Sequence, residues 1–488
     1  MIKRLLYIIL TIAFVTCCKD PLPPAPGPDP EPGPTPGVKD STSTPVPPQP
    51  GKTLTREYVW DDAVIPEIHI NITKEEFNKL LGYYDAISAE SIVESTSAVE
   101  CNFSFIKGTD TTNLTKTALR LRDNEDARRP YGSKGQKYGA EGAKWNLATY
   151  EVDFKSLNDK EKINSTFRRM MLKSCYNDPS YAREKFSYDM MEDFGIWTAS
   201  KDSYCRLFIT VEKSKNTAYL GVYQMIESIN QDFLTQRAAE FKSADGYLWK
   251  CDKEAFLNTL KGNFGVESET GSVSTYTLLT NLTEFNTAKQ QLQKFMQNFV
   301  TLKDAKFQAW IEGVCDVDLL LKTYAANVAL GMWDDYWNRG NNYYIYFNTK
   351  DVTNYQVYFI PYDYEMTLGN SKKGYMLDSG THDPLAWGSD KAPLIAKLLT
   401  FEKYRDIYID HLYDLIDPYN FYFNIESAPG LIKKLMKKVS PYVSNDTGIN
   451  MVVRDAPASW SSTPNYRLTD YSENNYFLVK SQTISKIE

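Results

Sequence analysis

Acidic and amide side chains gather in two short segments of the second half of the sequence. The first segment carries Asp334, Asn341 and Asn342, and the second carries Asp363 and Glu365. In phosphoryl-transfer enzymes of the kinase type, one aspartate accepts the proton of the attacking hydroxyl, while an asparagine and a later aspartate hold Mg²⁺ against the nucleotide phosphates. The order of these residues is consistent with that chemistry.

The spacing leaves a second interpretation open. Asn341 follows Asp334 by seven residues, not the five of an HRDxxxxN loop, and the sequence contains no DFG motif. On this alternative, the polar residues only satisfy backbone groups around a tyrosine-rich hairpin.

The neighbouring sequence predicts the elements that must position these residues. Residues 316–331 are apolar, begin at an aspartate cap and end at Gly331, which predicts a buried helix just before Asp334. Two strand-like runs follow, 343–347 and 356–360, joined by a polar turn. The hairpin would deliver Asp363 at its far end.

The rest of the body predicts an α+β arrangement with two lobes, strands early and helices late. Thr73 and Glu76 form a capping box, and Asp178 and Arg183 are expected to pair at the start of a helix. Alternating patterns predict strands at 65–72, 150–156, 205–212 and 219–226, and helical patterns cover 182–195 and 284–300.

Other chemistries are excluded by composition. The 488 residues contain three histidines and no CxxC pair, Ser-His-Asp signature or HExxH motif, which argues against zinc sites and serine or metalloprotease chemistry. The 55 Lys and Arg against 62 Asp and Glu give a net charge of −7. This acidity argues against binding nucleic acid, which needs a basic surface.

The N-terminus predicts export and tethering. Lys3 and Arg4 precede an apolar run that is too short to span a bilayer and stops at Cys17-Cys18. We expect residues 1–17 to be a lipoprotein signal peptide and Cys18 to carry the lipid; cleavage and release is the alternative. Residues 18–52 are rich in proline, and we expect them to form a disordered, extended linker.

Several motifs resemble one family in their order along the chain. They are LRLRDNEDARRPYGSKGQ (119–136), NDPSYAREKFSYDMMEDFGIWTA (177–199), YLGVYQMIESINQDFLTQR (219–237), GYLWK (246–250), TYAANVALGMWDDYWNRGNNYYIY (323–346) and VYFIPYDYEMTLG (357–369). Together they resemble the spore-coat kinase (CotH) family of atypical secreted protein kinases, most closely members carried as lipoproteins by Bacteroidetes. The resemblance implies a bilobed kinase-like fold with a strand-rich N-lobe (53–235) and a helical C-lobe (236–488).

The resemblance also implies roles for individual residues. Asp334 would be the catalytic base. Asn342 with Asn341 beside it, together with Asp363 and Glu365, would hold Mg²⁺. The strand that ends in Glu227 would link the lobes, where kinases present backbone groups to the adenine of ATP.

The first half departs from the family pattern around the phosphates. Arg122 matches the phosphate-facing segment, but Asp123 follows it where the family has glycine. Glu151 aligns with the family's strand lysine, and Lys173 is either its substitute or a solvated strand residue. A basic loop could close over phosphates or be a surface loop; its residues are Arg128, Arg129, Lys134 and Lys137.

Two functions therefore stay open. The body could use ATP and Mg²⁺ to phosphorylate a hydroxyl of an extracytoplasmic protein, or it could have lost turnover and serve as a surface scaffold that binds protein or glycan. Either form would be an outer-membrane lipoprotein, exposed at the cell surface and joined to the membrane only by its lipid, with no nucleic-acid partner.

Overall fold

The computed structural model describes residues 51–487, apart from 87–96, 123–127, 155–163, 179, 213–216, 253, 259–261, 268–273, 371–379, 421, 424–426 and 444–475. Met1–Gln49 and Pro50–Glu488 are separate units. Cys18, the proline-rich segment and Asp123 lie outside the described residues.

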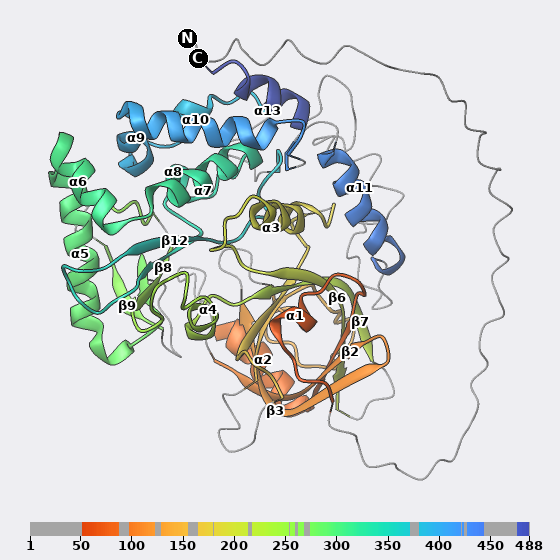
Figure 1. The fold of residues 1–488 in the computed structure, drawn as a ribbon. Coiled ribbons are helices and arrows are strands. Elements are labelled where there is room, and N and C mark those ends of the chain that lie inside the picture. The colour runs from red at the N-terminus through yellow and green to blue at the C-terminus, as the bar shows by residue number, and fades with distance from the viewer. Residues whose placement is uncertain are drawn as a thin grey trace, which may run out of the picture. The chain divides into compact units, whose positions relative to one another are not determined.

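The first half of the body forms a closed barrel (Figure 1). Its strands run in the order β1-β2-β3-β4-β5-β7-β6, and parallel pairing of β6 with β1 closes the ring. The strands are β1 (Glu67–Ile72), β2 (Val99–Lys107), β3 (Asp110–Arg122), β4 (Thr149–Asp153), β5 (Arg169–Ser174), β6 (Asp202–Val211) and β7 (Ala218–Glu227).

Alternation along the barrel strands sends one set of side chains into the barrel and the other set outward. Met170 and Leu172 of β5 belong to the core inside the barrel, whereas Met171 belongs to the core of the second half. Because side chains alternate along a strand, Lys173 lies on the same outward face as Met171. This outward face also carries Arg169 of β5 and Glu151 of β4.

The second half contains a five-stranded sheet in the order β12-β11-β8-β10-β9. The predicted hairpin is confirmed: β11 and β12 pair antiparallel, with Tyr343 opposite Pro361. The strands are β8 (Tyr247–Cys251), β9 (Phe264–Val266), β10 (Tyr276–Leu278), β11 (Tyr343–Phe347) and β12 (Val357–Pro361).

The longer helices lie mostly in the second half (Figure 1). The described helices are α1 (Arg56–Val59), α2 (Lys74–Ala86), α3 (Arg183–Asp193), α4 (Gln231–Gln236), α5 (Phe285–Thr301), α6 (Asp304–Val314), α7 (Val317–Leu330), α8 (Tyr336–Arg339), α9 (Pro393–Leu399), α10 (Glu402–Ile416), α11 (Ala428–Val439) and α13 (Tyr476–Ile484).

Several local predictions are confirmed. The backbone N–H of Glu76 donates to Thr73 Oγ1 at 3.1 Å at the start of α2. The Asp316 side chain caps α7, which ends at Gly331 with φ 68°. Arg183 binds the carboxylate of Asp178 at 2.6 Å at the start of α3. The mixed α/β class is therefore correct.

The closed barrel and the second sheet were not predicted. Closure requires β1 to pair with β6, and pairing between strands so distant in the chain leaves no local pattern. Strands β8, β11 and β12 of this sheet are buried along their whole length, so they lack the alternation that marks a half-exposed strand. No helix in the described part of the chain is long and apolar enough to cross a membrane.

Candidate active site

Lys173 joins three carboxylates from distant parts of the chain. It extends from β5, and its Nζ lies 2.7 Å from Glu184 Oε2 on α3 and 3.4 Å from Glu365 Oε2. It also binds Asp363 Oδ1, just beyond the end of β12. The side chains of Lys173 and Glu184 are only 8% and 2% exposed. Asp363 and Glu365 are 29% and 13% exposed, so the chain builds a partly buried acidic cluster around one buried lysine.

The charges of this cluster do not balance. Three carboxylates and one ammonium group leave two negative charges. Burial alone lowers the pKa of Lys173, but Asp363, Glu184 and Glu365 together raise it well above its ordinary value. Burial raises the pKa of Glu184 to about 7, with repulsion from Asp363 and Glu365 acting against the attraction of Lys173.

The same carboxylates fit a hard divalent cation. One oxygen each from Glu184, Asp363 and Glu365 lie within 4.8 Å of one another. Mg²⁺ prefers oxygen ligands, and two positive charges would offset the excess negative charge. Asp363 adopts a positive φ of 64°, which is uncommon for a residue other than glycine. Its backbone N–H donates to the Tyr188 hydroxyl at 3.1 Å.

Asp334 lies in the loop between α7 and α8. Its Oδ1 accepts from Asn341 Nδ2 and its Oδ2 from Asn342 Nδ2, each at 3.3 Å. Arg339 Nε lies 3.5 Å from Oδ1, and the Asp334 side chain is 18% exposed. The amides and Arg339 orient the carboxylate, and its partial exposure leaves room for a substrate hydroxyl to approach.

Asn370 ties the Asp334 loop to the acidic cluster. The indole Nε1 of Trp333 donates to the Asn370 carbonyl at 2.9 Å, and Asn370 Nδ2 donates to the carbonyls of Glu365 and Asn177 at 3.0 Å. Asn177 Nδ2 in turn donates to Glu365 Oε1 at 2.8 Å. The two acidic segments predicted from the sequence therefore belong to one hydrogen-bonded site.

A cavity of about 470 Å³ lies between the barrel and the second sheet. The connection from β7 to α4 forms one side, through Ser228, Ile229 and Asn230. Tyr362, the residue before Asp363, lines the cavity, and its hydroxyl donates to Met171 Sδ at 3.5 Å. Met171, which shares the outward face of β5 with Lys173, also lines the cavity, so the cavity borders the acidic cluster.

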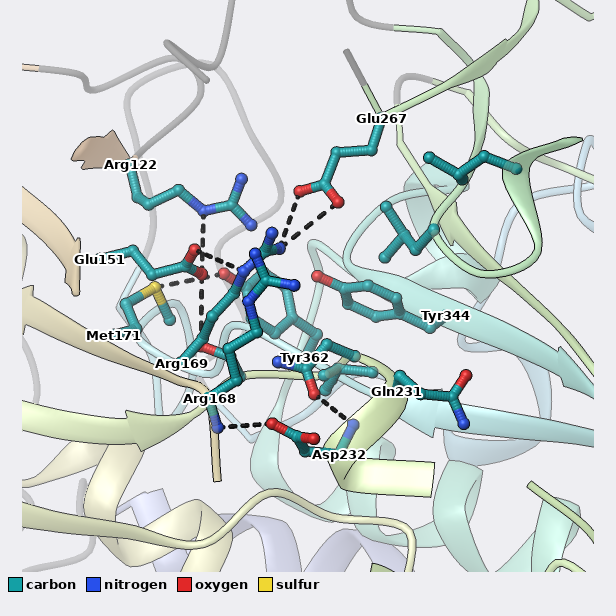
Figure 2. A pocket seen from close by; sticks show the side chains of 15 residues that line it. Arg122, Glu151, Arg168, Arg169, Met171, Gln231, Asp232, Glu267, Tyr344 and Tyr362 are labelled. Atoms are coloured by element: carbon teal, nitrogen blue, oxygen red, sulfur yellow. Dashed lines mark hydrogen bonds and ion pairs between the residues drawn. The ribbon is translucent and has the colours of Figure 1, made fainter. Parts of the chain in front are cut away.

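Arginines and acids pair with one another at the cavity (Figure 2). Glu151 lies 2.8 Å from Arg120 Nε and 3.6 Å from Arg122 Nε, and Arg169 Nη1 donates to Glu267 Oε1 at 3.0 Å. Burial by itself raises the pKa of Glu151, but Arg120, Arg122 and Arg169 lower it to about 2. Glu151 is thus the centre of an ion-pair network.

The structure brings most of the predicted site residues together in two groups, whereas Arg122 and Glu227 lie in separate ion-pair networks. Lys173 meets Asp363 and Glu365 in one group, and Asp334 meets Asn341 and Asn342 in the other. Arg122 lines the cavity beside Glu151. Both carboxylate oxygens of Glu227 are bound by Arg237, at 3.1 and 2.6 Å, and Arg56 also contacts this group.

The structure shows the contacts of Lys173 and of the basic loop, whose roles the sequence left open. Lys173, two residues beyond the Met171 that pairs with Glu151, is the cation that reaches Asp363. In the basic loop, Arg129 is buried and its Nε binds Asp85 Oδ1 at 2.8 Å, so this side chain braces the loop against α2.

Glu184 was not predicted. It follows Lys173 by eleven residues, at the first turn of the helix expected at 182–195. A strand lysine followed by an acid near the start of the next helix was the available signal. Sequence reasoning missed Glu184 because Glu151, and not Lys173, occupies the position of the family's strand lysine.

One comparison with known proteins finds a match. A family model described as CotH kinase protein matches residues 106–476. Among curated proteins, none matches this chain. The matched range includes every described residue of the acidic cluster, the Asp334 loop and the cavity.

Proposed function

Because this chain belongs to the CotH kinase family, we propose that it binds ATP with Mg²⁺ and transfers a phosphoryl group to a protein hydroxyl. The contact of Lys173 with both Glu184 and Asp363 carries this proposal. Protein kinases need a strand lysine paired with a helix glutamate, together with an aspartate that holds Mg²⁺. We also infer that the barrel and the second half act as two lobes around the cavity.

The acidic cluster would bind the metal. Asp363 and Glu365 supply carboxylate oxygens, and Glu184 and Lys173 hold these groups in place. Mg²⁺, when bound, would neutralise charge on the phosphates of ATP. Asn341 and Asn342 are predicted metal ligands. Their amide nitrogens donate to Asp334, so a metal would be bound by their amide oxygens.

Asp334 would accept the proton of the attacking hydroxyl. A general base must lie within hydrogen-bond reach of that proton, and Asp334 is the partly exposed carboxylate of its loop. Arg339 lies near this carboxylate and the amides of Asn341 and Asn342 donate to it, and these contacts set its orientation.

The cavity would receive the nucleotide. It is bordered by the connection between the two halves, by Tyr344 and Tyr362, and by Arg122 and Arg169. Its position beside Asp363 would direct the phosphates towards the metal-binding carboxylates.

The test compares label transfer from radioactive ATP to an added acceptor protein, with Mg²⁺, for the wild type and four variants. Asp334→Asn should lower the rate by about 10²- to 10⁴-fold, the usual contribution of general-base catalysis. Asp363→Ala and Lys173→Met should also abolish most transfer. Lys403→Met, which breaks an exposed ion pair with Glu312, is the control and should transfer label normally. Equal rates in all five proteins would refute the assignment.

A second candidate is a binding protein without turnover. The observation that favours it is the cavity network, in which Glu151, Glu267 and Asp153 already pair with Arg120, Arg122 and Arg169. Such arginines have little charge left for phosphates. Failure of the wild type to bind ATP in calorimetry would leave this candidate as the function.

We further propose that the protein reaches the cell envelope as an outer-membrane lipoprotein, attached through Cys18 and exposed at the surface. The basic and apolar residues before Cys18 and the proline-rich segment after it support this location. Metabolic labelling with a fatty acid in wild type and Cys18→Ser would test it.

A further inference from the structure

A buried hydrogen-bonded bridge joins the two acidic segments inside the protein. The Tyr364 hydroxyl donates to Asn327 Oδ1 at 2.5 Å, and Asn327 Nδ2 donates to Asp335 Oδ2 at 2.9 Å. Tyr364, Asn327 and Asp335 are 1%, 4% and 3% exposed. We call these three side chains the Tyr364 bridge.

Each end of the Tyr364 bridge adjoins a group used in the proposed chemistry. Tyr364 lies between Asp363 and Glu365, and its backbone N–H donates to Glu184 Oε1 at 3.1 Å. Asp335 directly follows Asp334. A shift at either end of the bridge would therefore move a metal-binding carboxylate relative to the proposed base.

Asp335 also holds the backbone of the Asp334 loop. Its Oδ1 accepts from the backbone N–H of Asn338 at 2.9 Å and caps α8. Its carbonyl accepts from the N–H of Arg339 at 3.0 Å and of Asn341 at 3.2 Å. The residues that contact Asp334 are thus fixed through Asp335.

A buried carboxylate is costly unless it is hydrogen-bonded, so Asp335 depends on its donors. Burial raises the pKa of Asp335 to about 7, while the donors Asn338 and Asn327 act in the opposite direction. Asn327 can satisfy Asp335 only if its amide is oriented with the nitrogen towards this carboxylate. With the nitrogen donating to Asp335, the amide oxygen accepts from the Tyr364 hydroxyl, so the two contacts support the same orientation.

We propose that Asn327 and Tyr364 are positioning residues that set the separation between Asp334 and the carboxylates of Asp363 and Glu365. This inference rests on the proposed function, but the coupling between the two segments is a property of the folded protein and can be measured without turnover.

The test uses Tyr364→Phe, which removes one hydroxyl and keeps the ring. Amide hydrogen exchange across residues 333–342 should become about tenfold faster, because the loop loses a buried hydrogen bond that restrains it. In the phosphoryl-transfer assay, kcat should fall by about 10- to 100-fold with KM for ATP unchanged, since small misplacements act on the chemical step.

Tyr346→Phe is the matched control. Tyr346 is fully buried, and its hydroxyl donates to the Ser243 carbonyl at 2.9 Å, outside the Tyr364 bridge. This variant loses the same group and should have similar thermal stability to Tyr364→Phe. Its exchange across 333–342 and its kcat should match the wild type.

A swapped pair gives a second test. Asn327→Asp alone places two carboxylates together and should lower kcat. Combined with Asp335→Asn, it restores one amide and one carboxylate, and Asn remains a good helix cap, so kcat should recover.

The results separate the two proposals. Equal exchange across 333–342 in Tyr364→Phe and Tyr346→Phe would overturn the positioning role. Faster exchange in Tyr364→Phe, in a protein whose wild type transfers no phosphate, would uphold the positioning role and refute the proposed function.

Discussion

Replacing Lys173 by methionine tests the balance of charge in the acidic cluster. Methionine keeps much of the side-chain length and removes the positive charge, so Glu184, Asp363 and Glu365 would face one another without a cation. Breaking a buried ion pair by removing one partner costs about 3–5 kcal/mol, because a buried charge is left uncompensated. We expect a loss of this size in the free energy of unfolding measured in urea at pH 8 without divalent metal.

A double-mutant cycle isolates the contact with Glu184. Lys173→Met with Glu184→Gln removes one positive and one negative charge, so the net charge of the cluster stays at two negative charges, as in the wild type. The double variant should therefore be more stable than the sum of the two single changes predicts, by about 1–3 kcal/mol.

The control cycle uses Lys403 and Glu312, whose atoms are also 2.7 Å apart but whose side chains are 61% and 44% exposed. Solvent screens this pair, so its variants should change stability little. If Lys173→Met were as mild as Lys403→Met, or if its cycle showed no coupling, burial would not strengthen the contact as argued.

Two further predictions concern pH. The pKa of folded Glu184 is raised to about 7 from 4.5, so its contribution to stability is complete below about pH 4.5 and is lost as the pH rises through 7. Calorimetric Mg²⁺ affinity should rise between pH 6 and 8 as this proton leaves, and Glu184→Gln should flatten the rise; an affinity constant over this range in the wild type would contradict the prediction. The pKa of Glu151 is lowered to about 2, so its contribution is present above pH 4.5 and is lost as the pH falls through 2. Glu151→Gln should cost about 3–5 kcal/mol in urea unfolding at pH 7, with a smaller loss near pH 2; the same loss at both values would refute the ion-pair network as its cause.

The local elements could be predicted because their signals are short. A capping residue and a terminal glycine mark α7, and the β11–β12 hairpin has a polar turn between two aromatic runs. These features place Asp334 after a helix and Asp363 after a strand from the sequence alone.

Short sequence signals could not show that Lys173 is the strand lysine that reaches Asp363. Lys173 meets Asp363 across 190 residues, and only the pairing of β4, β5 and β7 determines which outward side chain reaches the second half. Glu151 and Lys173 both point outward from adjacent strands, so alternation does not distinguish them. The partners of the Glu227 carboxylate could not be predicted either, because Arg56 and Arg237 come from distant positions on either side of it in the sequence.

The strand order of this molecule has a consequence for its behaviour at high local concentration. A closed barrel offers no unpaired edge to which another chain could add a strand. In the second sheet, the outer strand β9 is three residues long, and the other outer strand, β12, ends in Pro361, which has no N–H to donate. Short edges and edge prolines discourage strand addition. Many copies could therefore be crowded together with little tendency to join into larger sheets.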